Sequence, residues 1–349
     1  MRNIVLMIRL LLFLLSSYGY WDYFRKEAKM NVFFLPAFTI CLQTMLLFFA
    51  GLLNILKPVA VLIFAFGLLL AVVTLYREGR ESIRPYLNVG YVFLGISFAL
   101  VFIATKGHIF SHWDDFNHWA VIERCMLETD RYPTFKDSMV RFRSYAPGSA
   151  TYIYYFSKII SGGKVVAESI QMAAQAFMML AFILPVFKYV KKNKVISATF
   201  VLLFANFLLC YDVKIYALLV DTLLPLQAMA MLLFIYSECL RMDKNVNRGG
   251  GIDILYATPF MCMQVLIKTS GMFFAVIASL LIINSLRYER SRLKVKLAVA
   301  MSPFISFFLW HAHCDYVYPT VMTSEHAVSI SYYSGIISGK TAEDIRLFS

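Results

Sequence analysis

The sequence predicts an all-α polytopic membrane protein, and three observations indicate this class. Hydrophobic residues make up 60% of the 349 residues and charged residues only 15%, whereas an ordinary soluble domain is roughly 45–50% apolar and about 25% charged. Aromatic residues reach 16%. Long apolar runs alternate with short basic clusters along the chain. A soluble fold of this composition would expose large apolar patches to water, so soluble, disordered and disulfide-scaffold classes are excluded.

The apolar runs give the number of spans. A spanning helix needs about 20 mostly apolar residues, and we expect about ten transmembrane helices. The candidate spans are residues 3–19, 31–53, 58–76, 88–105, 167–187, 195–210, 217–238, 253–268, 270–286 and 296–312. The first is short and can instead lie in the membrane interface. No internal repeat relates the two halves, which argues against an inverted-repeat transporter.

The basic residues indicate which loops face the cytoplasm. They gather in the short loops 77–84, 188–194, 241–248 and 287–296, which the positive-inside rule places in the cytoplasm. Much of the net charge of +12 lies in these loops, so nucleic acid is not expected as a partner. Alternation of the spans then places the long segment 106–150 outside. The side of the N-terminus stays open.

We therefore divide the chain into four parts. They are N-terminal transmembrane helices (1–105), an extracytoplasmic loop with short amphipathic helices (106–166), further transmembrane helices (167–312) and an extracytoplasmic tail (313–349). Because the tail ends without a returning span, we expect the natural protein or its homologues to continue beyond it. The six cysteines form no Cys-x-x-Cys pair and are interpreted as small core residues.

Two adjacent carboxylates, Asp114 and Asp115, stand among aromatic residues directly after the fourth predicted span. The residues from 115 to 128 follow a helical period and predict an amphipathic helix on the membrane surface. Its apolar stripe consists of Phe116, Trp119, Ile122 and Met126. One Asp can simply cap this helix. A pair flanked by His112 and His118, however, has more polar chemistry than a cap requires.

Cations follow on the same outer segment. Arg141 and Arg143 precede a turn that contains Tyr145. Arginine matches phosphate oxygens bidentately, so this pair is a candidate phosphate site. The alternative is that both arginines contact lipid headgroups.

Further ionisable residues lie at the outer ends of later spans. Asp212 and Lys214 share one short turn, and Lys268 ends another span. Ionisable groups at membrane depth are functional candidates. Lys268 can reach a lipid phosphate, or it can extend to the outer interface. Asp221 can pair with Lys214 or with Lys268 instead of touching substrate.

The loop motifs resemble those of a known superfamily. The string Trp-Asp-Asp-Phe-x-His-Trp at 113–119, followed by Asp137-Ser138 and by Tyr-Ala-Pro-Gly at 145–148, resembles the first outer loop of GT-C membrane glycosyltransferases. The likeness is to uncharacterised Gram-positive members related to the protein O-mannosyltransferase and aminoarabinose transferase group. It covers about residues 107–150. Asp115 stands where those proteins usually have Glu, and Ala146 where they have Pro.

The resemblance implies an inverting sugar transfer outside a bacterial cytoplasmic membrane. The donor would be a polyprenyl-phosphate-linked sugar and the acceptor a glycan, lipid or protein of the cell envelope. Asp114 matches the leading Asp of the family motif and would act as general base, because an Asp with a pKa near 4 is ionised at neutral pH. Asp115 would assist. A divalent cation, Mg²⁺ or Mn²⁺, is left open as cofactor, with Asp114 or Asp115 as its ligand.

The expected substrate-binding residues are chosen by chemistry. They are Arg141, Arg143, Tyr145, His118, Lys268, Asp212 and Lys214. Fixed cations among them can stabilise the charge that gathers on the departing lipid phosphate. Two other functions stay open, a transporter or flippase of lipid-linked glycans and a polymerase of surface polysaccharide.

Overall fold

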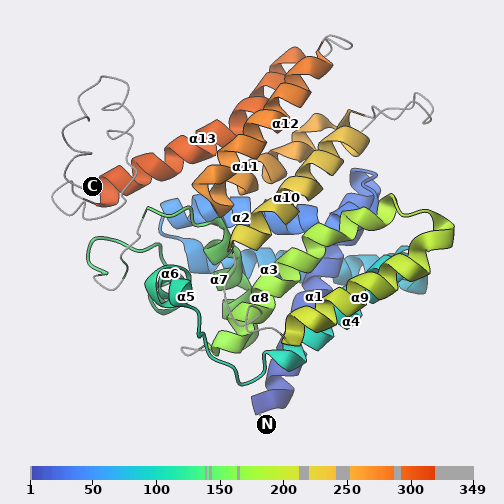
Figure 1. Ribbon diagram of the computed structural model, residues 1–349, viewed down its shortest axis with the longest axis horizontal. Coiled ribbons are helices and arrows are strands. Elements are labelled where there is room, and N and C mark those ends of the chain that lie inside the picture. Colours follow the sequence, from blue (N-terminus) through green and yellow to red (C-terminus); the bar gives the residue numbers. More distant parts are fainter. Residues whose placement is uncertain are drawn as a thin grey trace.

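Every regular element in the described part of the chain is helical. The structure is a computed structural model, and it describes residues 2–137, 140, 144–162, 166–211, 220–240, 252–286 and 292–318. The α-helices are α1 (Arg2–Glu27), α2 (Leu35–Leu52), α3 (Leu56–Glu78), α4 (Val89–Ala104), α5 (Trp113–Asn117), α6 (Trp119–Thr129), α7 (Gly148–Ser161), α8 (Glu168–Ile183), α9 (Val195–Tyr211), α10 (Val220–Phe234), α11 (Thr258–Ile267), α12 (Met272–Ser285) and α13 (Leu293–Val317). The all-α prediction is confirmed for these residues (Figure 1).

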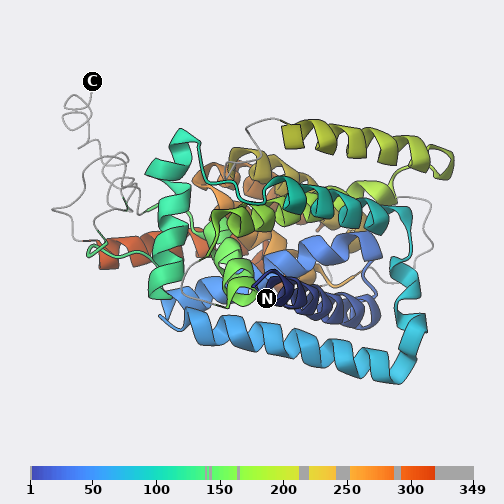
Figure 2. The same ribbon diagram turned by 90° about the horizontal axis from the view of Figure 1, so that it is seen from below.

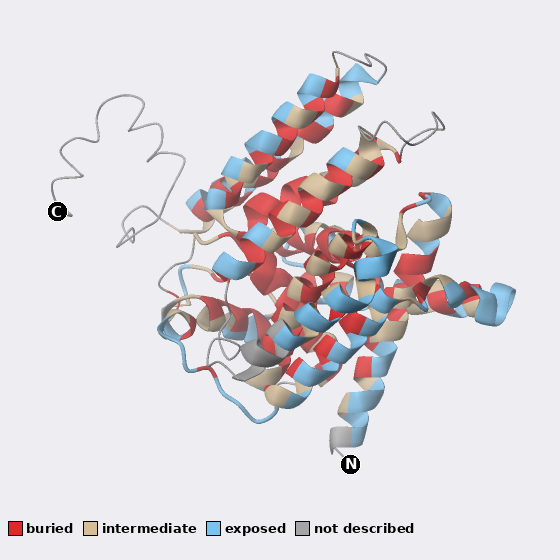
Figure 3. Cartoon of the chain, turned by 45° about the vertical axis from the view of Figure 1, so that its right-hand side comes forward, coloured by how far each residue is buried: buried red, intermediate tan, exposed pale blue. Residues whose placement is uncertain are grey.

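Six helical segments of the described chain are long and apolar enough to cross a membrane. They are Ile4–Glu27, Val32–Leu52, Leu56–Ser82, Glu168–Lys188, Val220–Cys239 and Leu293–Val317. The exposed face of α3 carries large apolar side chains such as Leu62 and Leu69, as expected for contact with lipid. Buried and exposed positions alternate along several helices (Figure 3). The other predicted spans coincide with the shorter helices α4, α9, α11 and α12. Multi-pass membrane character is therefore supported, and the number of ten spans stays a prediction.

The first helix is longer than the expected span of residues 3–19. α1 continues to Glu27 because Tyr20 and Trp21 are buried against neighbouring helices. In its last turns, Asp22 is buried and forms ion pairs with Arg25 and Lys26. These ion pairs compensate the burial of charge at this end of the helix. Hydropathy alone places these charged residues in a loop.

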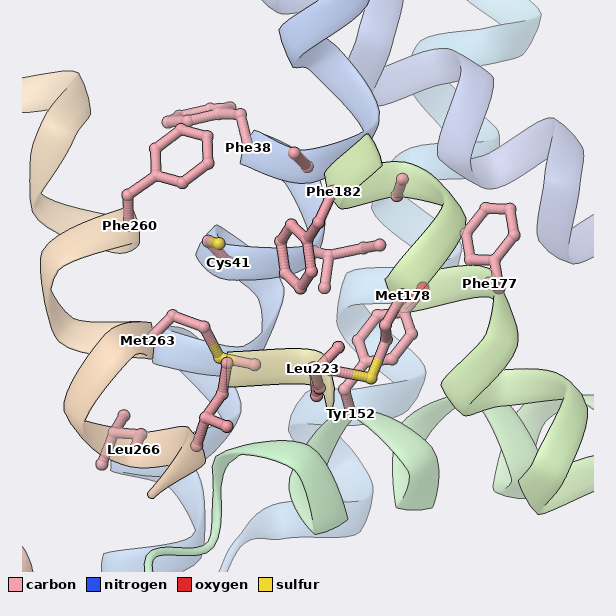
Figure 4. Close-up of a cluster of buried hydrophobic side chains, with 14 of the residues drawn as sticks. Phe38, Cys41, Tyr152, Phe177, Met178, Phe182, Leu223, Phe260, Met263 and Leu266 are labelled. Atoms are coloured by element: carbon pink, nitrogen blue, oxygen red, sulfur yellow. The ribbon is translucent and has the colours of Figure 1, made fainter. Parts of the chain in front are cut away.

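The core lies where α2, α7, α8, α10 and α11 meet (Figure 4). Large side chains from all five helices interlock there, and each of those named is at most 2% exposed. They include Phe38 and Cys41 of α2, Tyr152 of α7, Met178 and Phe182 of α8, Leu223 of α10, and Phe260 and Met263 of α11. Between helices in a bilayer, such contacts stabilise through close van der Waals packing rather than through removal of apolar surface from water.

α7 is a core helix inside the predicted outer loop. Its residues Tyr152 to Phe156 are at most 1% exposed, and it packs against α1, α2, α6 and α8. Gly162 ends the helix in the left-handed conformation (φ 55°). Residues 106–166 therefore contain, besides short helices, a segment that belongs to the helical bundle.

α5 and α6 lie across one end of the bundle, where α6 crosses the direction of α3 and α4 (Figure 2). The predicted stripe residues Trp119, Ile122 and Met126 are buried, which confirms an amphipathic helix there. The continuous helix expected from residue 115 is wrong, because the backbone breaks at His118 (φ −131°, ψ −80°). Phe116 consequently lies outside the stripe and is 61% exposed.

Polar contacts join segments that the basic-residue count places on the same side. At one end of the bundle, Lys26 pairs with Glu78, Lys188 with Glu238, and Arg292 with Asp253. At the other end, Lys57 pairs with Asp130. There, Trp310 and Tyr318 also donate hydrogen bonds to the backbone carbonyls of Ser144 and Pro133. The described helices therefore fit the predicted alternation. Which end faces the cytoplasm stays a prediction.

Candidate functional site

The two adjacent carboxylates lie in different environments. Asp114 and Asp115 occupy the first turn of α5, where the partial positive charge of a helix start favours anions. The side chain of Asp114 is 48% exposed, whereas Asp115 is fully buried. Neighbouring residues on a helix point about 100° apart, which explains the difference. Of the predicted pair, only Asp114 is accessible to a molecule arriving from outside.

Two histidines flank the Asp114 carboxylate. His112 Nδ1 lies 3.6 Å from Oδ2, and His118 Nε2 lies 4.0 Å from Oδ1. The His112 Nδ1 atom also accepts a hydrogen bond from the backbone N–H of Asp114 at 3.3 Å. A nitrogen that accepts this bond carries no proton, so Nδ1 does not donate to the carboxylate. The cap of α5 is therefore His112 rather than an aspartate.

Tyr145 joins this group through its ring. It packs 5.2 Å from Trp119 and 5.4 Å from His118, measured between ring centroids. The backbone of the turn is fixed by Trp310, whose indole N–H donates to the Ser144 carbonyl at 2.9 Å. A Cβ at Gly148 would lie 2.6 Å from the Leu266 carbonyl oxygen. Only glycine permits this approach, which brings the Tyr145 turn against the end of α11.

Lys268 lies next to that contact. It has an extended backbone between α11 and the turn at Thr269–Gly271. Its ammonium forms an ion pair with Asp221 in the first turn of α10. This is one of the two partners that the sequence predicted for Asp221. Both side chains are partly exposed, at 39% for Lys268 and 77% for Asp221.

The electrostatics of Tyr145 link these groups. Burial raises the pKa of its hydroxyl, Lys268 lowers it, and Asp114 and Asp221 raise it. The three charged groups come from α5, from α10 and from the residue after α11. The structure brings together five residues that the sequence singled out separately, which are Asp114, His118, Tyr145, Asp221 and Lys268. We call this group the Asp114 cluster.

A buried carboxylate that the sequence reasoning missed lies behind Asp115. Glu123 of α6 is 1% exposed. Burial and the Asp115 carboxylate both raise its pKa well above the usual range. Its position was visible in the sequence, because Glu123 follows Trp119 by four residues and so lies on the apolar stripe of the helix.

Glu168 is a second residue whose role the sequence did not reveal. At the start of α8, it accepts a hydrogen bond from the backbone N–H of Phe110 at 2.5 Å. It also accepts one from Arg124 of α6 at 2.9 Å. One carboxylate thus ties the segment before α5, the surface helix α6 and the membrane helix α8 together. Glu168 fixes where the Asp114 cluster lies.

Several predicted site residues lie outside the described residues. They are Arg141, Arg143, Asp212 and Lys214. Within the described ranges, no group of three or more His, Cys, Asp and Glu side chains is arranged to hold a metal ion. A divalent cation on Asp114 or Asp115 therefore stays a prediction.

Comparisons with models of protein families, with curated proteins and with solved structures gave no match.

Proposed function

We propose that the protein is a membrane glycosyltransferase of the GT-C type. It would move a sugar from a polyprenyl-phosphate carrier to an acceptor on the outer side of a bacterial cytoplasmic membrane. The observation that carries the proposal is the Asp114 cluster. There, the accessible Asp114 carboxylate lies beside His118, whose ring contacts Tyr145, and the Tyr145 turn packs against the end of α11, directly before Lys268.

Asp114 is the proposed general base. It accepts the proton of the acceptor hydroxyl while that oxygen attacks the anomeric carbon of the sugar and the bond to the carrier phosphate breaks. A carboxylate at half exposure can reach a hydroxyl that binds from outside. Its neighbour Asp115 is buried and does not contact substrate directly. Asp115 is therefore a positioning residue in this scheme.

Lys268 is the proposed partner of the departing phosphate. The leaving lipid phosphate gains negative charge as the sugar departs, and a fixed ammonium stabilises that charge. Lys268 already pairs with Asp221, so its ammonium is held at the cluster before the donor binds. The half-buried ring of Tyr145 packs at a tilt against the buried Trp119 and offers a surface on which the sugar can lie.

The test is sugar transfer by the purified protein. The protein is supplied with polyprenyl-phosphate-linked hexoses and a cell-envelope glycan, and release of polyprenyl phosphate is measured. Asp114→Asn should lower the rate by roughly 100-fold or more, because a general base contributes about 10²–10⁴-fold. Glu128→Gln changes an exposed carboxylate of α6 and serves as the matched control. Transfer by Asp114→Asn at the wild-type rate would refute the assignment of the base.

A further inference from the structure

A long apolar groove runs between α1 and α4. It encloses about 1180 Å³ and also touches the C-terminal end of α7 and the start of α8. From Arg9 to Trp21 on α1 it follows 12 residues, or about 18 Å of helix. Its middle is lined by aliphatic and aromatic side chains, among them Leu10, Leu94 and Phe98. The groove is therefore suited to a hydrocarbon chain.

Two cations stand near one end of the groove. They are Arg9 of α1, with Val5, Leu6 and Met7 lining the groove beyond it, and Lys106, which follows α4. Arg9 donates to the carbonyl of Ser161, a neutral partner. In the described part of the chain, neither cation pairs with a carboxylate, and no lining side chain of the groove is acidic. This end therefore has unbalanced positive charge above an apolar channel.

The length of the groove indicates what kind of lipid fits. One leaflet of a bilayer has a hydrocarbon thickness of about 15 Å, half of the usual 30 Å. From Arg9 the groove continues for about 18 Å, roughly the thickness of one leaflet, to Trp21 and Tyr91. The chain of an ordinary membrane phospholipid occupies one leaflet, with its phosphate at the interface. Arg9 and Lys106 stand where that phosphate would lie.

The groove is separate from the Asp114 cluster. It reaches α7 at Ile160 and Ser161, whereas Tyr145 and Gly148 lie at the opposite end of the same helix. α7 has 14 residues and is about 21 Å long. No residue of the Asp114 cluster lines the groove. The inference below does not depend on the proposed function.

We infer that the groove between α1 and α4 binds one anionic phospholipid of the surrounding leaflet, with its phosphate between Arg9 and Lys106. Gly95 of α4 makes the inference testable. It lines the groove, and a Cβ built on it meets no atom within 4 Å. A large side chain at this position would fill the space for the lipid chain without displacing protein atoms.

The experiment counts lipids bound to the purified protein by native mass spectrometry. The protein is titrated in detergent with phosphatidylglycerol, phosphatidylcholine or undecaprenyl phosphate. The wild type should bind one phosphatidylglycerol roughly 10- to 30-fold more tightly than phosphatidylcholine, since each basic residue near a phosphate contributes about a factor of five. Gly95→Phe should weaken binding of phosphatidylglycerol at least tenfold.

Matched variants distinguish the contribution of the lipid's hydrocarbon chain to binding from that of its headgroup. Ile96→Phe adds the same ring on the adjacent residue, which does not line the groove, and should bind like the wild type. The double variant Arg9→Gln/Lys106→Gln should bind both phospholipids equally, whereas Lys136→Gln, which changes a cation on the outer segment, should keep the preference.

Three results would overturn the inference. They are wild-type binding by Gly95→Phe, an undiminished preference in the double variant, and a preference of the wild type for undecaprenyl phosphate over phosphatidylglycerol. A monodisperse elution profile serves as the folding control for each variant. If Gly95→Phe does not fold, the double variant decides.

Discussion

The carboxylates near the two ends of α6 differ in how closely they are paired with cations. Beyond its C-terminal end, Asp130 contacts Lys57, Lys158 and Tyr154. Nearby, Asp137 accepts two hydrogen bonds from the Arg131 guanidinium, at 2.8 and 3.1 Å. Before its N-terminal end, Asp114 has two histidines at 3.6 and 4.0 Å as its ionisable neighbours among the described residues. Only α6, with its 11 residues, separates the two groups of carboxylates along the chain.

The difference separates structural carboxylates from one available for chemistry. At the C-terminal end, burial opposes ionisation, but hydrogen bonds from Arg131 and Thr134 lower the pKa of Asp137 to about 2. Such a carboxylate is held by its partners and is a poor proton acceptor. Asp114 is exposed on one side and free of a close cation within the described residues. The contrast teaches that pairing, not the presence of a carboxylate, distinguishes the two ends.

The largest expected effect tests this contrast directly. Asp114→Asn should lower the transfer rate roughly 100-fold or more, yet leave Tm within about one degree, because an exposed carboxylate without a close cation contributes little to stability. Thermal unfolding in detergent measures this. A fall in Tm of several degrees would show that Asp114 has a structural role like that of Asp137.

Removing the Lys268 ammonium should have the next largest effect. Lys268→Gln is expected to lower the transfer rate roughly 100-fold, by analogy with the loss of one charge-stabilising donor. Asp221→Asn, the matched control, removes the ion pair but keeps the ammonium and should change the rate only a few-fold. If both variants lost activity equally, the ion pair itself rather than the ammonium would be what the site requires.

Asp137→Asn should weaken the fold and spare the chemistry. Its lowered pKa corresponds to about 1–2 kcal/mol of stability after allowance for solvent screening. Because the folded pKa lies below the usual value, this stability is present above pH 4 and is lost as the pH falls from about 4 to about 2. Unfolding measured across that range should show the loss in the wild type and not in the variant. A pH-independent wild type would contradict the assignment.

Glu123→Gln should have a smaller effect of opposite sign. Burial and the Asp115 carboxylate raise the pKa of Glu123, so the folded state keeps a proton that the unfolded chain has released. Stability then falls as the pH rises above the ordinary glutamate range. The neutral variant should therefore have a higher Tm than the wild type at pH 8 and the same Tm near pH 4. A lower Tm at pH 8 would mean that the charged form is the one the fold stabilises.

Much of the fold was predictable because it depends on local pattern. The apolar runs predicted where the long helices lie, and the stripe of Trp119, Ile122 and Met126 predicted a surface helix. α7 was not predicted, since its run of Thr, Tyr and Phe becomes a core helix only when neighbours such as α1, α2, α6 and α8 surround it. Local composition carries no information about that environment.

The Asp114 cluster was predictable residue by residue but not as a group. More than 100 residues separate Lys268 from Asp114 and Tyr145 in the sequence. The three residues meet because Gly148 fits against Leu266. The break at His118 was equally hidden, because the apolar period continues through it. Glu123, in contrast, could have been found from its place on the stripe.

The central claim is that Asp114 lies outside the membrane, opposite the basic loops. Single cysteines at the exposed positions Ser111 and Lys192 can be labelled in intact cells with a membrane-impermeant maleimide, after replacement of the native cysteines. We expect Ser111→Cys to be labelled without permeabilisation and Lys192→Cys only after it. Labelling of both positions from the same side would contradict the claim.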